Sequence, residues 1–127
     1  MKKKILIVAA NYYKDITKKL ISGAIKKISK KNTFKIIFVS GAFEIPFVIS
    51  KNIKKYHAFI ALGCVIKGQT PHFDFICNAT FNALMKLSVD KKKPIGNGII
   101  TCLNMSQAKK RSIKKGEEAS NAIFKLI

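Results

Sequence analysis

The sequence lacks any long hydrophobic run. No stretch approaches the roughly 18 apolar residues that a membrane-spanning helix needs. The apolar run that follows Lys4 near the amino terminus is also too short for a convincing signal peptide. Apolar residues nevertheless make up 48% of the 127 residues, which suits a globular core and not a disordered chain. We therefore expect residues 1–127 to form a single domain with no membrane partner.

Cysteine is scarce, and its spacing excludes the usual frameworks. The three cysteines, Cys64, Cys77 and Cys102, form an odd set without a C-x-x-C pair. Each lies in an apolar stretch, which is typical of a reduced thiol in a protein core. This pattern predicts a cytoplasmic protein without structural disulfides.

Acidic residues and arginine are both rare. The sequence has six acidic and 25 cationic residues, which gives a formal net charge of +19, and Arg111 is the only arginine. Nucleic-acid surfaces more often combine arginine with aromatic residues, because the guanidinium forks onto phosphates and stacks on bases. Here the lysines fall mostly on the predicted outer faces of helices, as at Lys18, Lys19, Lys109 and Lys110. We interpret them as a solvated, compositionally biased surface with no specific nucleic-acid partner.

Apolar runs and helical periodicities alternate along the chain. Four apolar runs predict buried strands, at 4–10, 34–39, 58–66 and 95–102. Between and after them the pattern predicts helices at 16–28 with Asp15 as a cap, at 42–53 with Pro46 in the first turn, at 73–87, at 106–111 and from 117 to the end.

This alternation predicts an α/β, flavodoxin-like three-layer sandwich with a four-stranded parallel sheet and right-handed crossovers. Ligands bind such sheets outside the carboxyl ends of the strands. The rule brings three segments together: 11–13 after the first strand, 40–44 after the second, and 67–72 after the third. Their convergence predicts the functional site.

Two of these segments allow a structural interpretation as well as a functional one. Tyr12 either covers the end of the sheet or offers a stacking surface to a planar ligand. The turn from Gly41 to Glu44 either exposes amides to a ligand or only lets the Glu44 carboxylate complement a helix dipole.

The third segment carries the residues best suited to acid–base chemistry. Gly68, Gln69 and Thr70 before a helix start suit a phosphate, although the full P-loop pattern is absent. His72 is better explained as a proton shuttle than as a metal ligand with its neighbours, since the spacing matches no standard metal site. Arg111 is either a surface cation or a bidentate phosphate ligand.

Three motifs together resemble the lumazine synthase family. They are Gly41-Ala42-Phe43-Glu44-Ile45-Pro46, the stretch from Leu62 to Asp74 (LGCVIKGQTPHFD), and Gly98-Ile99-Ile100-Thr101 with Gln107-Ala108 downstream. The resemblance spans nearly the whole chain. It implies a homopentamer with active sites between subunits, and no cofactor or metal. The implied transferase activity, in riboflavin biosynthesis, condenses 5-amino-6-(D-ribitylamino)uracil with 3,4-dihydroxy-2-butanone 4-phosphate and releases phosphate and water.

The resemblance also assigns roles by position. His72 matches the proton donor, and Tyr12 matches the aromatic residue that stacks on the pyrimidine. The other substrate-binding positions it implies are Ala42, Phe43, Glu44, Cys64, Val65, Ile66, Gln69 and Thr70, with Asn97 and Arg111 reaching in from the adjacent subunit. Asn97 stands where phenylalanine is common, and the link from Arg111 to Lys115 is shortened by several residues.

Two other interpretations remain. A riboflavin synthase of the archaeal type shares a similar fold, although the intact motif from Lys67 to Asp74 argues against it. A basic nucleic-acid-binding module is the alternative from another class. Steep salt dependence of binding to arbitrary DNA or RNA would favour that module.

Overall fold

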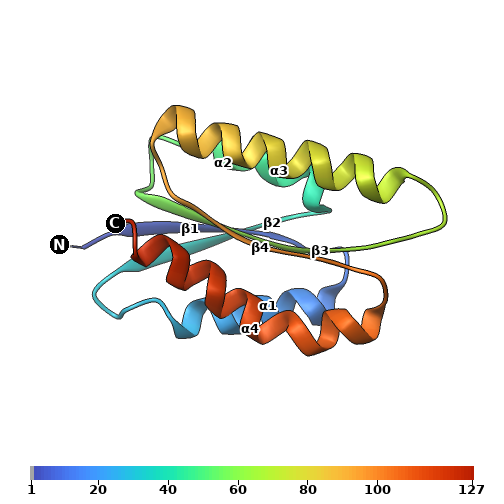
Figure 1. The fold of residues 1–127 in the computed structure, drawn as a ribbon. Coiled ribbons are helices and arrows are strands. Elements are labelled where there is room, and N and C mark those ends of the chain that lie inside the picture. Colours follow the sequence, from blue (N-terminus) through green and yellow to red (C-terminus); the bar gives the residue numbers. More distant parts are fainter. Residues whose placement is uncertain (1) are drawn as a thin grey trace.

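The computed structural model describes residues 2–127 and places a sheet of four parallel strands between two layers of helices (Figure 1). Helices α1 and α4 cover one face of the sheet, and α2 and α3 cover the other (Figure 1). In chain order the elements are β1 (Lys4–Ala10), α1 (Lys14–Lys26), β2 (Thr33–Val39), the 3₁₀ turn η1 (Ala42–Glu44), α2 (Ile45–Lys51), β3 (Ala58–Ile66), α3 (His72–Lys91), β4 (Ile95–Cys102) and α4 (Met105–Phe124).

The strand order is β2-β1-β3-β4, with every neighbouring pair parallel. This is the flavodoxin-like order, in which the chain reverses direction across the sheet between β1 and β3. The predicted fold class is therefore confirmed, and the carboxyl ends of all four strands lie at one edge of the sheet.

The core divides into two clusters because successive side chains of a strand point to opposite faces. On β1, Ile5 and Ile7 pack toward α1 and α4, whereas Leu6 and Val8 pack toward α2 and α3. All four side chains are fully buried. The unbroken apolar run of β1 thus fills both faces, as a central parallel strand requires.

One strand is less buried than the sequence predicts. β2 is an edge strand, paired only with β1, and its residues are exposed or half-buried. Phe34 and Phe38 are among the exposed large apolar side chains. The prediction of four buried strands is wrong for β2, because its apolar composition did not reveal that it lies at the edge.

The two predicted carboxyl-terminal helices are one continuous helix, α4. The expected break lies near Gly116, which sits inside the helix. A Cβ atom at Gly116 would lie 2.1 Å from the Leu20 carbonyl oxygen, and one at Gly23 would lie 2.1 Å from that of Ile113. Glycine therefore serves close packing of α4 against α1 and does not end the helix. The shortened link after Arg111 is consequently helical, with no loop.

Two helix starts also differ from prediction. Tyr13 is the residue that precedes α1, and Asp15 lies in the first turn, where its charge complements the helix dipole without capping it. The predicted helix at 42–53 begins as the 3₁₀ turn η1 and continues as α2, which ends at Lys51. Pro46 lies in the first turn of α2, as predicted. Between Lys2 and Ile127, none of the helices is long and apolar enough to cross a bilayer.

Candidate active site

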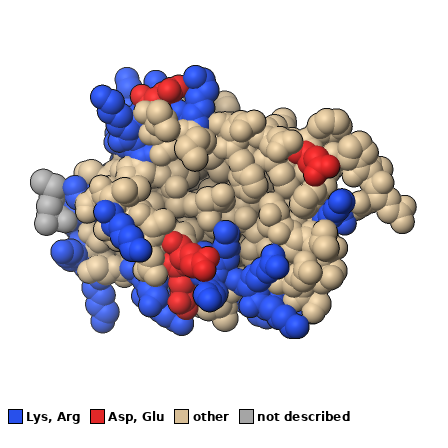
Figure 2. Space-filling view, in the orientation of Figure 1, with Lys and Arg blue, Asp and Glu red and all other residues tan. Residues whose placement is uncertain are grey.

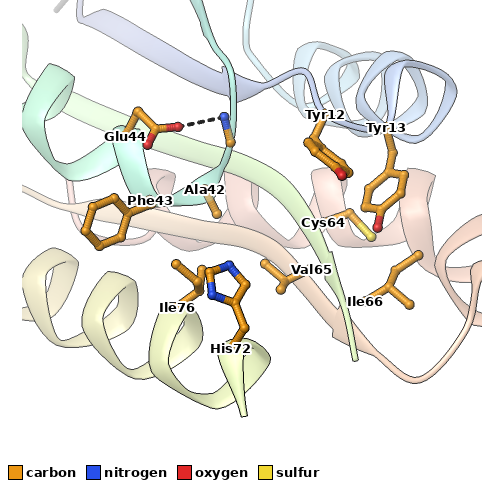
Figure 3. Close-up of a pocket in the computed structure, with 11 residues that line it drawn as sticks. Tyr12, Tyr13, Ala42, Phe43, Glu44, Cys64, Val65, Ile66, His72 and Ile76 are labelled. Carbon is orange, nitrogen blue, oxygen red and sulfur yellow. Dashed lines mark hydrogen bonds between the residues drawn. The ribbon is translucent and has the colours of Figure 1, made fainter. Parts of the chain in front are cut away.

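A cavity of about 680 Å³ opens at the carboxyl ends of the central strands. Its volume lies within the usual range for small-molecule sites. The segments predicted to follow the first two strands line it, and the third predicted segment contributes His72 (Figure 3). The lining residues are Tyr12, Tyr13, Gly41, Ala42, Phe43, Glu44, Cys64, Val65, Ile66, His72 and Ile76.

The first wall is a pair of tyrosines between β1 and α1. The rings of Tyr12 and Tyr13 meet edge to face, with centroids 4.8 Å apart and planes at 78°. Tyr12 is 74% exposed, so one face of its ring is open to a planar ligand. Tyr13 is half-buried and packs against the core beneath α1.

The opposite wall comes from the turn after β2. The backbone N–H of Gly41 donates to Oε1 of Glu44 at 2.9 Å. Gly41 has no side chain to complete a capping box, so the Glu44 carboxylate alone binds this backbone N–H, and Glu44 also lines the cavity. Phe43 is 59% exposed beside it. The Phe43 ring and the Glu44 carboxylate, which the Gly41 N–H holds in place, can therefore contact the same ligand.

The end of β3 supplies Cys64, Val65 and Ile66 between these walls (Figure 3). Burial, followed by the neighbouring Cys102 thiol, raises the pKa of Cys64 to about 12. The thiol is therefore protonated at neutral pH. Because the thiolate is the reactive form of cysteine, Cys64 is suited to line the cavity and not to act as a nucleophile.

His72 is the first residue of α3 and points into the cavity beside Ile76 and Val65 (Figure 3). The N–H of His72 donates to Oγ1 of Thr70 at 3.4 Å, which helps define the start of the helix. The side chain is exposed, so it can exchange protons with a ligand and with solvent. A solvent-accessible imidazole within an apolar pocket can act as a general acid or base.

Four predicted site residues lie outside this cavity. Gln69 and Thr70 are exposed on the loop between β3 and α3. Asn97 is exposed on edge strand β4, where its Oδ1 accepts the Ile99 N–H at 3.0 Å. Arg111 lines a separate cavity of about 260 Å³ on α4, with Lys110, Lys114, Lys115 and Glu118. Neither Asn97 nor Arg111 of this chain belongs to the main pocket.

Three lining residues were not among the predicted site residues. Tyr13 and Gly41 lie in the segments expected to converge, but neither was selected as a contact. Ile76 lies one helical turn after His72, so its helical spacing placed it on the same side. This helical spacing from His72 was the feature of the sequence that could have identified Ile76 as a lining residue.

The side chains here do not form an evident metal centre. Among residues 2–127, no three His, Cys, Asp or Glu side chains gather closely enough to hold an ion. Cys77 is buried, and that burial, with Asp74 nearby, raises its thiol pKa. His72, Asp74 and Cys77 are therefore better described as one helix turn than as a ligand set.

The fold and the pocket together define a flavodoxin-like α/β protein with an aromatic-walled small-molecule site around a histidine. Comparison with known proteins gives the family. The sequence profile of the 6,7-dimethyl-8-ribityllumazine synthase family matches residues 2–127. The chain belongs to this family and is a transferase.

Individual relatives agree with the profile, and each carries the name 6,7-dimethyl-8-ribityllumazine synthase. The Bartonella tribocorum protein is 42% identical over 137 aligned positions, covering 100% of this chain and 91% of its own. The Bartonella henselae protein is 41% identical over 132 positions, covering 97% and 85%. The Corynebacterium kroppenstedtii protein is 42% identical over 110 positions, covering 86% and 69%.

Proposed function

We propose that this protein is a 6,7-dimethyl-8-ribityllumazine synthase of riboflavin biosynthesis. It condenses 5-amino-6-(D-ribitylamino)uracil with 3,4-dihydroxy-2-butanone 4-phosphate and releases phosphate and water. The observation that carries the proposal is the family match along residues 2–127, together with a pocket that gathers His72 and the aromatic residues at the strand ends.

The pocket suits the pyrimidine substrate. The open face of Tyr12 stacks on the ring, and Cys64, Val65 and Ile66 provide the apolar surface beneath it. The turn at Ala42, Phe43 and Glu44 holds the ribityl chain and the edge of the ring.

The butanone phosphate binds at the outer rim. Gln69 and Thr70 lie on the loop that leads to His72, and Arg111 comes from the adjacent subunit. A planar guanidinium can hold a phosphate through two parallel hydrogen bonds. The loop backbone at Gly68 has room for this group, because a Cβ atom there would meet nothing within 4 Å.

The reaction chiefly needs placement and proton transfer. An amine of the uracil attacks the ketone to form an imine, phosphate leaves, and the second amine closes the ring. His72 shuttles the protons that these steps add and remove, and the phosphate site stabilises the departing anion. Holding both substrates in one pocket supplies most of the remaining rate gain.

Purified protein mixed with both substrates tests this function. Lumazine formation, followed by absorbance and fluorescence, should depend on both substrates and on protein concentration. A folded, assembled protein that forms no lumazine would contradict the proposal. Salt-dependent binding to arbitrary DNA in that same preparation would instead favour the nucleic-acid alternative.

We also propose that the protein is a cytoplasmic homopentamer with its active sites between neighbouring subunits. The three cysteines are free and buried, which suits a reducing compartment. Asn97 and Arg111 lie outside their own subunit's pocket, so a neighbour must supply them if they act on substrate.

Helix α3 offers the surface for self-association. Its exposed positions Phe75, Asn78, Asn82, Met85 and Val89 repeat at alternating intervals of three and four residues. None of them is charged, in a chain whose net charge is +19. In Figure 2, Lys and Arg side chains lie over the layer of α1 and α4 and over the carboxyl-terminal end of α3. The amino-terminal half of α3 shows no Lys or Arg side chain. A stripe with this spacing suits packing against identical helices.

Met85→Lys should weaken the pentamer, because Met85 is 66% exposed on this stripe and five added charges would be brought together. We expect the native mass to fall from about 71 kDa, five times the 14.2 kDa chain, toward smaller species at micromolar protein. Leu126→Lys is the matched control, since Leu126 is 73% exposed just beyond the end of α4 and is not part of the α3 stripe. An unchanged mass for Met85→Lys would remove α3 from the interface.

A further inference from the structure

Tyr13 lies in the pocket wall, and hydrogen bonds from Thr17 hold its backbone carbonyl. Its carbonyl oxygen accepts the Thr17 N–H at 3.0 Å and the Thr17 hydroxyl at 3.1 Å. The same Thr17 hydroxyl also lies 2.6 Å from the Ala10 carbonyl, and Thr17 is buried. The end of β1 and the start of α1 are thus tied together around Tyr13, which holds its Cα in a fixed position relative to the sheet.

The Tyr13 hydroxyl is neutral at physiological pH, as in any tyrosine, and can donate a hydrogen bond. Burial, then the Tyr12 phenol and the Cys64 and Cys102 thiols, raises the pKa of Tyr13 above its ordinary value. In Figure 3 the hydroxyl end of the ring points toward Cys64, which lines the same pocket. A protonated phenol in such an apolar setting is suited to donate one hydrogen bond to a ligand acceptor.

The Tyr13 ring also determines where Tyr12 lies. Tyr12 is 74% exposed, and its ring contacts that of Tyr13 edge to face. Aromatic pairs prefer this geometry, which is worth about 0.5–1.5 kcal/mol beyond the area they bury. A fixed Tyr13 therefore holds an otherwise exposed stacking surface in place before a ligand arrives.

We propose that Tyr13 is a specificity-determining residue for the pyrimidine substrate. Its hydroxyl donates a hydrogen bond to a carbonyl oxygen of the uracil ring, and its ring holds Tyr12 in the stacking position. This inference rests on the proposed function, since it names a contact within that same site.

Tyr13→Phe separates the two contributions, because it keeps the ring pair and removes only the donor. We expect the Kd for 5-amino-6-(D-ribitylamino)uracil, measured by calorimetry, to rise about fivefold. The KM for that substrate should rise equally, while kcat and the KM for the butanone phosphate stay within about twofold. Tyr13→Leu also removes the ring contact and should raise the Kd by about 20-fold in total.

Tyr56→Phe is the matched control. Tyr56 is another half-buried tyrosine, packed edge to face on Phe59 away from the pocket, and its substitution should leave the Kd unchanged. If Tyr13→Phe binds and turns over the pyrimidine as the wild type does, the proposal for Tyr13 is wrong and the proposed function stands. If the wild-type protein neither binds the pyrimidine nor forms lumazine, both are wrong.

Discussion

His72→Ala is expected to lower kcat about 100-fold, which is within the range for losing a general acid–base group. The imidazole lies at the start of α3 and points into the pocket beside Val65 and Ile76. Imine formation, phosphate departure and ring closure all need protons moved there. Because His72 is exposed, its loss should change neither the fold nor the proposed pentamer. Initial rates at saturating substrate and native mass measure both effects.

The other histidine provides the control. His57 lies at the opposite edge of the sheet, where its Nδ1 accepts the Lys4 N–H at 2.9 Å. His57→Ala should therefore leave kcat near that of the wild type, although it removes a bond to β1. A His72→Ala enzyme with normal kcat would exclude His72 as the proton shuttle. A collapsed assembly would show that His72 has a structural role.

Arg111→Ala is expected to raise the KM for the butanone phosphate by about 10- to 100-fold, because hydrogen bonds to charged groups are worth about 1.5–3 kcal/mol. The KM for the pyrimidine should change little, since the residues proposed to hold the ring line the main pocket, which Arg111 does not line. Steady-state kinetics with each substrate varied in turn separates the two constants.

Lys110→Ala is the matched control for Arg111, because Lys110 lines the same small cavity and its loss removes the same charge. A smaller effect at Lys110 would identify bidentate binding by the guanidinium, whereas equal effects would indicate general attraction by the basic helix. If both variants keep the wild-type KM, Arg111 is a surface cation.

The sequence was a good guide where local patterns decide the structure. Unbroken apolar runs predicted strands such as β1 and β3, and parallel strand ends predicted where the pocket lies. The break predicted between residues 111 and 117 was wrong, because Gly116 in that interval packs α4 closely against α1 inside one continuous helix. The exposure of β2 depends on strand order, which no short segment encodes.

The site itself was predictable only in part for a related reason. Residues near strand ends or within a distinctive motif, such as Tyr12 and His72, were found and line the pocket. Tyr13 was not selected, because its proposed role in binding depends on the hydrogen bond between Thr17 and its carbonyl oxygen and on its ring contact with Tyr12. A sequence pattern shows neither contact. Placing Asn97 and Arg111 on substrate requires a second copy of the chain, which the sequence of one chain does not position.

Co-assembly of the two impaired variants, assayed at a butanone phosphate concentration well below the raised KM of Arg111→Ala, tests the shared active site most directly. His72→Ala and Arg111→Ala subunits carrying different tags would be co-expressed, and pentamers containing both would be isolated and assayed. If Arg111 serves the neighbouring pocket, about a quarter of the interfaces in a random one-to-one mixture pair an intact His72 with an intact Arg111. We therefore predict about a quarter of the wild-type activity. Activity no greater than that of the separate variants would contradict an active site completed by the adjacent subunit.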